Sequence, residues 1–223
     1  MNKEFYTRVY TTDYVVDSPQ EKERLDVVLP MIGTGKTVLD LGCSDGTISK
    51  MIREMGNSVE CIEISDHSIE RCKEKGLKVY DLDLNMSWGD SIPNKYDVVF
   101  AGEVLEHIFE TDIFLSSIYK VLKVDGYLIL STPNLASLGR RLLLMLGKNP
   151  IMELTTRNYE AGHLRYYVYS SLKKVLLDNN LKIVDFKSDI VNFDKSGNIS
   201  SAFLAHVIPT LGRSLIIKAV KNG

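Results

Sequence analysis

The chain of 223 residues has little of what marks a disulfide-rich, zinc-binding or membrane-spanning protein. Its three cysteines, Cys43, Cys61 and Cys72, are odd in number and lack Cys-x-x-Cys spacing, so we expect reduced thiols. No apolar run approaches the roughly 18 residues of a membrane span, and charges stand where a signal peptide would be apolar. These absences predict a cytoplasmic protein.

The chain also lacks an excess of basic residues. Its 27 lysines and arginines against 29 aspartates and glutamates give a formal net charge of −2, which argues against a nucleic-acid partner because such proteins present a basic face to phosphates. Hydrophobic residues make up 44% of the chain, enough for a full core, so we expect a single domain over residues 1–223. Short apolar segments alternate with helical ones, which indicates an α/β fold with a parallel sheet.

The most informative segment is Val-Leu-Asp-Leu-Gly-Cys-Ser-Asp-Gly at residues 38–46. Gly42 and Gly46 bracket a tight turn after an apolar strand, which lets a ligand lie against the backbone. Their G-x-x-x-G spacing differs from the G-x-G-x-x-G of dinucleotide-binding turns, and Asp40 would repel a pyrophosphate. A carboxylate at this point favours a ligand with sulfonium and ammonium groups, such as S-adenosylmethionine.

A second acid follows about twenty residues beyond the glycine turn. A helical pattern over residues 47–55 ends at Gly56, and residues 58–63 alternate as a strand that finishes on Glu63. At that position a carboxylate is placed to accept hydrogen bonds from both hydroxyls of a ribose. A plain surface acid is the alternative.

With these motifs in this order, the chain resembles the class I S-adenosylmethionine-dependent methyltransferase superfamily. The resemblance covers roughly residues 25–190 and is to the small-molecule branch, similar to O-methyltransferases of the ubiquinone pathway. Its further motifs are a strand that ends at Asp81-Leu82-Asp83, the stretch 102–107 with the pattern Glu-x-x-Glu-His, and a turn and strand over residues 121–134. The resemblance implies a Rossmann-like, seven-stranded, mostly parallel sheet with an antiparallel edge strand, helices on both faces and a small helical cap.

The same resemblance implies S-adenosyl-L-methionine as cofactor and S-adenosyl-L-homocysteine as product. The residues it implies for cofactor binding are Asp40, Gly42, Cys43, Gly46, Glu63, Ile64, Asp81, Leu82 and Gly102. Asp83 remains an alternative to Asp81 for holding the adenine amino group. Ser44 departs from the glycine found in many members of the superfamily.

Methyl transfer needs chiefly alignment and exclusion of water, so a base matters where the acceptor must lose a proton. His107 is our candidate for that base, with Glu103 as a second catalytic candidate; the alternative is that His107 orders the turn. Glu103, Glu106 and His107 together could bind a divalent cation, as the similar stretch does in ubiquinone-pathway enzymes. We nevertheless expect no metal.

Two cap insertions, approximately residues 134–168 and 191–212, are the expected sites of acceptor recognition. Leucines at helical spacing over residues 135–146 predict an amphipathic lid helix, for which we favour burial against the sheet over contact with a lipid-like substrate or a membrane. The Gly-His-x-Arg-aromatic pattern at residues 162–166 resembles the family, so His163, Arg165 and Tyr166 are expected to face the acceptor. The second cap is a candidate dimer surface.

The N-terminal region is expected to lie near the cofactor. Ser18 followed by Pro19 predicts the start of a helix that extends to residue 31. Upstream of it, Phe5, Tyr6 and Tyr10 either close over the cofactor or pack on the sheet.

We therefore predict a methyltransferase for a small-molecule acceptor, with an oxygen acceptor ahead of nitrogen or carbon, acting as a monomer or homodimer. The alternatives are a non-catalytic partner subunit of the same fold and an NAD(P)-dependent short-chain dehydrogenase. The latter rests on the Tyr-x-x-x-Lys spacing of Tyr169 and Lys173, without a dinucleotide-type glycine turn. The acceptor itself is not specified by these patterns.

Overall fold

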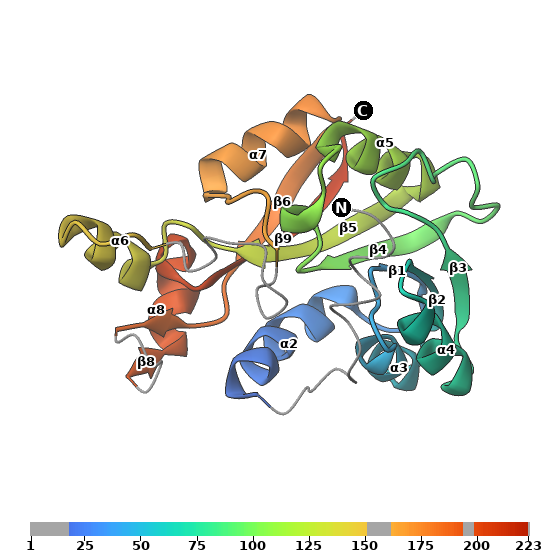
Figure 1. Cartoon of the computed structure of the whole chain (residues 1–223), viewed down its shortest axis with the longest axis horizontal. Coiled ribbons are helices and arrows are strands. Elements are labelled where there is room, and N and C mark those ends of the chain that lie inside the picture. The colour runs from blue at the N-terminus through green and yellow to red at the C-terminus, as the bar shows by residue number, and fades with distance from the viewer. Residues whose placement is uncertain (1–17, 151–161, 194–198, 223) are drawn as a thin grey trace.

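A seven-stranded sheet forms the centre of the computed structural model, which describes residues 18–150, 162–193 and 199–222 (Figure 1). The strand order is β3-β2-β1-β4-β5-β9-β6. The strands are β1 Thr37–Leu41, β2 Ser58–Glu63, β3 Lys78–Asp81, β4 Tyr96–Gly102, β5 Leu122–Pro133, β6 Leu181–Lys187 and β9 Ser214–Lys221. The predicted fold class is confirmed; in detail, the antiparallel strand β9 lies between β5 and the edge strand β6.

Helices cover both faces of this sheet. The helices of the described residues are α2 Pro19–Ile32, α3 Thr47–Glu54, α4 Asp66–Glu74, α5 Thr111–Val121, α6 Leu138–Met145, α7 Tyr169–Asp178 and α8 Ala202–Val207, with short 3₁₀ helices η1 Leu105–His107 and η2 Pro209–Leu211. Figure 1 shows α5 and α7 on one side of the sheet and α2, α3 and α4 on the other. The connections β1-α3-β2, β2-α4-β3 and β4-α5-β5 cross over through helices, as parallel pairing requires, whereas β3 leads to β4 without a helix.

Two apolar clusters fill the space between the sheet and the helices. Leu39 and Leu41 of β1 pack in the cluster under α5 and α7, whereas Val38 packs in the cluster under α2, α3 and α4. Successive strand residues point to opposite faces, so a strand buried on both sides is apolar throughout. Asp40 is the exception in β1, and it is 2% exposed.

Helix α2 begins where the sequence predicts. The side chain of Ser18 accepts a hydrogen bond from the backbone N–H of Glu21, and Pro19 occupies the first helical position. Leu25, Val28 and Ile32 are buried against the sheet. The aromatic residues upstream of α2 lie outside the described part of the chain.

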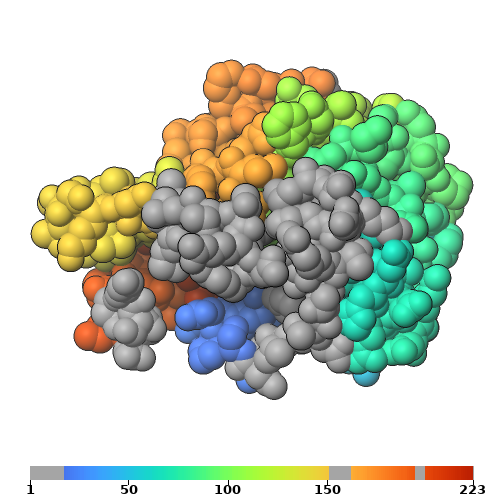
Figure 2. Space-filling model, in the orientation of Figure 1, coloured from blue at the N-terminus to red at the C-terminus, as the bar shows by residue number. Residues whose placement is uncertain are grey.

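Helix α6 contradicts the prediction of burial against the sheet. None of its residues is buried, and Leu144 and Met145 are 56% and 82% exposed. In Figure 2 the helix projects from the body of the molecule next to α8. The helix contacts β7 (Val191–Asn192), which pairs with β8 (Ser200–Ser201), instead of the main sheet. The spacing of the leucines predicts the helix but not the surface on which it packs. Contact of this helix with a lipid-like substrate stays a prediction.

The two cap segments contain this helix and the smaller elements. Residues 134–150 and 162–168 of the first segment are described, and residues 151–161 lie outside the described residues. The second segment, residues 191–212, holds β7, β8, α8 and η2. Among the helices of the described ranges, none is long and apolar enough to cross a membrane.

Candidate active site

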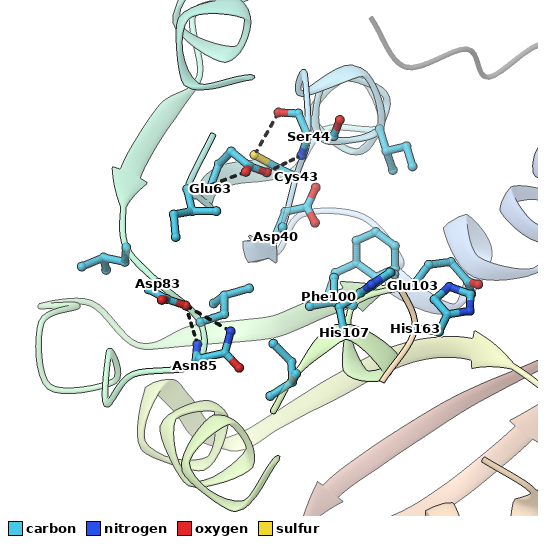
Figure 3. A pocket seen from close by; sticks show the side chains of 18 of the residues that line it. Asp40, Cys43, Ser44, Glu63, Asp83, Asn85, Phe100, Glu103, His107 and His163 are labelled. Carbon is cyan, nitrogen blue, oxygen red and sulfur yellow. Dashed lines mark hydrogen bonds between the residues drawn. The ribbon is translucent and has the colours of Figure 1, made fainter. Parts of the chain in front are cut away.

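A cavity of about 280 Å³ opens at the carboxyl ends of β1, β2 and β4 (Figure 3). In parallel sheets these ends meet at one edge, where the loops that follow the strands form a crevice. The cavity is lined by Arg24, Asp40, Gly42, Cys43, Ser44, Ile48, Glu63, Ile64, Leu82, Asp83, Leu84, Asn85, Phe100, Gly102, Glu103, Val104, His107, Ile108 and His163. Most of the residues predicted to bind a cofactor thus share one cavity.

The turn after β1 is built from left-handed backbone. Gly42, Ser44 and Gly46 have φ angles of 65°, 51° and 78°. A Cβ at Gly42 would lie 3.0 Å from Val104 Cγ2. Ser44, which stands where the superfamily often has glycine, holds this uncommon conformation while its backbone N–H donates to Glu63 Oε2 at 2.9 Å. The turn therefore keeps a conformation suited to glycine and is bonded to the end of β2.

Gly46 serves packing and does not line the cavity. A Cβ there would lie 2.6 Å from Leu77 Cδ1 and 2.9 Å from Cys72 Sγ. The residue precedes α3, which packs closely against the segment around α4 through this position. Its predicted contact with a cofactor is not supported by the cavity lining.

We expect Gly46→Ala to lower the free energy of unfolding by about 2–4 kcal/mol, because it combines left-handed strain with overpacking. Gly35 is a matched control, since its φ is 68° and a Cβ there meets nothing within 4 Å. Gly35→Ala should cost about 1 kcal/mol, from backbone strain alone. Urea denaturation of both variants measures the difference, and equal losses would contradict the packing argument.

Glu63 connects the turn after β1 with the loop after β2 in the cavity wall. Its carboxylate accepts hydrogen bonds from the N–H groups of Ser44, Ile64 and Ser65 at 2.8–2.9 Å. Burial raises the pKa of Glu63, although these three backbone bonds act in the opposite direction. Carboxylate oxygens accept more than one hydrogen bond each, so capacity remains for a ligand that enters the cavity.

Asp40 supplies a second, more deeply buried carboxyl group. Ser49 Oγ donates to Asp40 Oδ2 at 2.5 Å. Burial raises the pKa of Asp40 to about 7, opposed by the Ser49 bond and reinforced by the charge of Glu63. A positively charged ligand in the cavity would offset that cost by direct attraction.

Asp83, rather than Asp81, reaches the cavity after β3. Asp81 is exposed at the end of the strand and does not line the cavity, so its predicted role is not supported. Asp83 Oδ1 accepts hydrogen bonds from the backbone and side-chain nitrogens of Asn85, which also lines the cavity. The intervening residue Leu82 lines it as predicted, and its N–H donates to the carbonyl of Glu63.

Arg24 is a cavity residue that the sequence analysis missed. It is 4% exposed on the buried side of α2, and its Nη1 donates to Ser131 Oγ at 2.8 Å. Ser131 Oγ in turn donates to Glu103 Oε1 at 2.7 Å, and Arg24 Nη1 lies 3.9 Å from that oxygen. A cation four residues before Val28, within the apolar stripe of the helix, was the signal available in the sequence.

Glu103 is held toward Arg24 and Ser131. It has φ 56°, a conformation uncommon for a residue other than glycine. Burial raises the pKa of Glu103, whereas the charge of Arg24 lowers it. Among the described residues, the set close enough to share a metal ion is Glu106, His107 and His163, so Glu103 does not join the grouping that the sequence left open.

His107 and His163 face one another on the wall of the cavity away from Glu63 (Figure 3). Their ring centroids are 4.8 Å apart in an edge-to-face arrangement. Burial lowers the pKa of His163 to about 4, and the charge of Arg140 acts in the same direction, so its imidazole is neutral at pH 7. The two segments, η1 and the stretch before α7, come together here.

Glu106 lies behind these rings and outside the cavity lining. Its Oε2 accepts from Thr132 Oγ1, and its Oε1 lies 3.9 Å from His163 Nε2. Burial raises the pKa of Glu106 well above its usual value, with a further rise from Glu103. Ligand atoms of Glu106, His107 and His163 lie within 4.8 Å of one another, so within the described ranges these three could hold a metal ion.

Arg165 and Tyr166 do not line the cavity, contrary to their predicted acceptor role. The guanidinium of Arg165 donates to the carbonyls of Ile108 and Phe109, the latter at 2.8 Å. Tyr166 packs edge-on to His163 at 6.1 Å between ring centroids. A planar guanidinium can donate to two carbonyls at once, and these hydrogen bonds hold the segment that follows η1 in place.

Comparison with known proteins agrees with this geometry. A family model described as a methyltransferase domain matches residues 19–185. The chain belongs to this methyltransferase family. The predicted resemblance to class I S-adenosylmethionine-dependent methyltransferases is thereby confirmed.

Among curated relatives of the chain, the mitochondrial ubiquinone biosynthesis O-methyltransferase of Schizosaccharomyces pombe is 29% identical over 167 residues. The match covers 71% of this chain and 60% of that relative, so the chain spans about 60% of its length. Among solved structures, the CcbJ methyltransferase from Streptomyces caelestis has a TM-score of 0.68 at 14% identity, covering 98% of this chain and 96% of that one. Magnesium protoporphyrin IX methyltransferase from Synechocystis, with bound SAH, has a TM-score of 0.61 at 20% identity, covering 98% and 93%.

The short-chain dehydrogenase alternative disagrees with membership of the methyltransferase family and with the position of its two key residues. Tyr169 and Lys173 lie on α7, and neither lines the cavity. Tyr169 instead stacks on Phe186 of β6, with ring centroids 4.3 Å apart. The Tyr-x-x-x-Lys spacing is therefore coincidental.

Proposed function

We propose that the chain transfers the methyl group of S-adenosylmethionine to an oxygen atom of a small-molecule acceptor. The observation that carries this proposal is the convergence of Asp40, Glu63 and Asp83 on one cavity, beside the glycine turn at Gly42. With Glu103, four acids line the cavity, and such a lining favours a cationic ligand without phosphate groups. The relatives named as O-methyltransferases support oxygen as the acceptor atom.

The cavity residues fit the parts of this cofactor. Glu63 would accept hydrogen bonds from the ribose hydroxyls, and Asp83 from the adenine amino group. Asp40 offers negative charge to the methionine end, and Arg24 offers a guanidinium to its carboxylate. The cofactor itself supplies an activated methyl group on a sulfonium centre.

His107 is the group we propose to accept the proton of a hydroxyl acceptor. It lines the cavity and is 8% exposed, so it works away from bulk water. The neutral imidazole of His163 beside it does not oppose a positive charge on His107. Glu103, fastened to Ser131 and Arg24, would position the acceptor and exclude water.

Asp40 predicts a specific dependence of stability on pH. Its pKa is about 7 in the folded protein against 3.8 in a model compound. Between these values the folded state retains a proton that the unfolded chain has lost, so this group makes the free energy of unfolding fall as pH rises from about 4 to 7. The steepest contribution is about 1.4 kcal/mol per pH unit. Urea denaturation of Asp40→Asn should show a weaker fall over this range, and the same pH dependence as wild type would contradict it.

Two measurements test the proposed function. Isothermal calorimetry should show binding of S-adenosylhomocysteine and no binding of NAD. Mass spectrometry of a panel of phenol, catechol and carboxylate acceptors, incubated with the cofactor, should then reveal a mass gain of one methylene. Cofactor binding without transfer to any acceptor would favour the non-catalytic partner subunit, and binding of NAD alone would contradict the proposal.

A further inference from the structure

A second hollow, of about 270 Å³, adjoins the cavity and has a different chemical character. It is lined by Ser18, Gln20, Glu21, Arg24, Glu103, Pro133, Arg140, Arg213 and Ser214. Arg24 and Glu103 also line the first cavity, so the two spaces share a wall. We call this space the arginine hollow, because it is lined by arginines from α2, from α6 and from the position just before β9.

Arg213 is held rigidly at the floor of the arginine hollow. Its Nε and Nη2 donate to Asp189 Oδ2 at 2.9 and 2.6 Å, and Nη2 also donates to the carbonyl of Gln20. Asp189 is 4% exposed and accepts further bonds from Ser214. A guanidinium fixed in this way loses little conformational freedom when a ligand binds.

Arg140 reaches the hollow from α6, although that helix buries none of its own residues. Its Nη1 donates to the carbonyl of Asn134 at 3.0 Å. Asn134 is 1% exposed, and its side-chain amide donates to the carbonyls of Thr210 and Gly212, so the residue that accepts from Arg140 is itself held in place. The exposed helix therefore directs one charged side chain inward.

The two acids that line the hollow, Glu21 and Glu103, are engaged with Arg24, while Arg213 forms an ion pair with Asp189 and lies 3.6 Å from Glu23 Oε2. Glu21 accepts a hydrogen bond from Arg24 Nη2, and Glu103 lies 3.9 Å from its Nη1. Arg140 donates to the Asn134 carbonyl, and its positive charge also lowers the pKa of His163. Positive charge from Arg140 thus acts on both the arginine hollow and the imidazole wall of the first cavity.

We propose that the arginine hollow binds an anionic oxygen group of the methyl acceptor, a carboxylate or a phosphate. The acceptor would extend from Arg140 and Arg213, past Glu103, toward His107. Arginine forks match the geometry of both groups and bind them more strongly than neutral donors do. This inference rests on the proposed function, and it makes the substrate class an acidic small molecule.

The test uses benzoate and phenyl phosphate as probes, titrated by calorimetry into the full chain loaded with S-adenosylhomocysteine. We expect Arg140→Gln to weaken binding of the preferred probe about tenfold or more, because the variant loses a charge-assisted hydrogen bond to the probe. Arg141→Gln is the matched control, because Arg141 lies on the same helix, lines neither space and bonds to Ala136 and Thr210. It should bind the probes like wild type. The tighter of the two probes distinguishes carboxylate from phosphate.

Affinity for S-adenosylhomocysteine separates this inference from the proposed function. We expect it to be the same in wild type and Arg140→Gln. The inference is overturned if neither probe binds, if Arg140→Gln and Arg141→Gln behave alike, or if Arg140→Gln loses cofactor affinity, since the hollow would then hold the cofactor carboxylate. If wild type fails to bind the cofactor, the proposed function fails, and titration of the probes into the unloaded chain still reports on the hollow.

Discussion

Glu63→Gln is expected to reduce affinity for S-adenosylmethionine at least a hundredfold. The carboxylate accepts three backbone hydrogen bonds and, in the proposed complex, two more from ribose hydroxyls. An amide has one acceptor oxygen, and its NH₂ group would face backbone N–H groups that already donate. Hydrogen bonds to a charged group contribute about 1.5–3 kcal/mol each, so the loss of two accounts for the expected factor.

Calorimetry with S-adenosylhomocysteine measures this effect, and circular dichroism checks that the fold persists. The matched control is Glu60→Gln in the same strand, whose carboxylate bonds to Tyr80, Tyr96 and Lys78 away from the cavity. It should retain cofactor affinity. Wild-type affinity in Glu63→Gln would show that the cofactor site is wrongly assigned.

His107→Ala is expected to lower the rate of methyl transfer to a hydroxyl acceptor by about 10²–10⁴, the usual contribution of a general base. Cofactor affinity should stay within about twofold, because the imidazole lies on the wall opposite Glu63 and is reserved for the acceptor in this proposal. The rate and its pH profile are measured with saturating cofactor. The variant should also lose the rise of rate with pH that a neutral imidazole base produces.

His206→Ala provides the control for this prediction. His206 lies on α8, is exposed, and lines neither the cavity nor the arginine hollow, so its replacement should leave the rate unchanged. An unchanged rate in His107→Ala would assign His107 to the ordering of η1. A lower rate with an unchanged pH profile would indicate positioning of the acceptor, not proton transfer.

Most of the sheet and the cofactor side of the cavity could be predicted from the sequence. The strands that end on Asp40 and Glu63 were predicted within one residue of β1 and β2, and the start of α2 at Pro19 was predicted correctly. Strand alternation, glycine turns and helix caps depend on residues close together in the chain. The order of the parallel strands then brings their carboxyl ends to one edge.

The acceptor side was predicted less well. Of the three residues expected to face the acceptor, His163 lines the cavity, whereas Arg165 and Tyr166 do not. Adjacent residues in an irregular stretch point in different directions, and no periodicity reveals which of them turns inward. The same holds after β3, where a single residue, Leu82, separates Asp81 from Asp83, but of the two acids only Asp83 lines the cavity.

By itself, then, the sequence determined the family, the strands, most of the helices and the glycine turn that faces the cavity, because each depends on local patterns. The tertiary structure decided that Arg24, Arg140 and Arg213 share one hollow and that His107 faces His163. It also decided that α6 is exposed while Arg140 on it points inward. These relations join residues far apart in the chain, and they are set by how the caps pack on the sheet edge, for which one sequence carries no periodic signal.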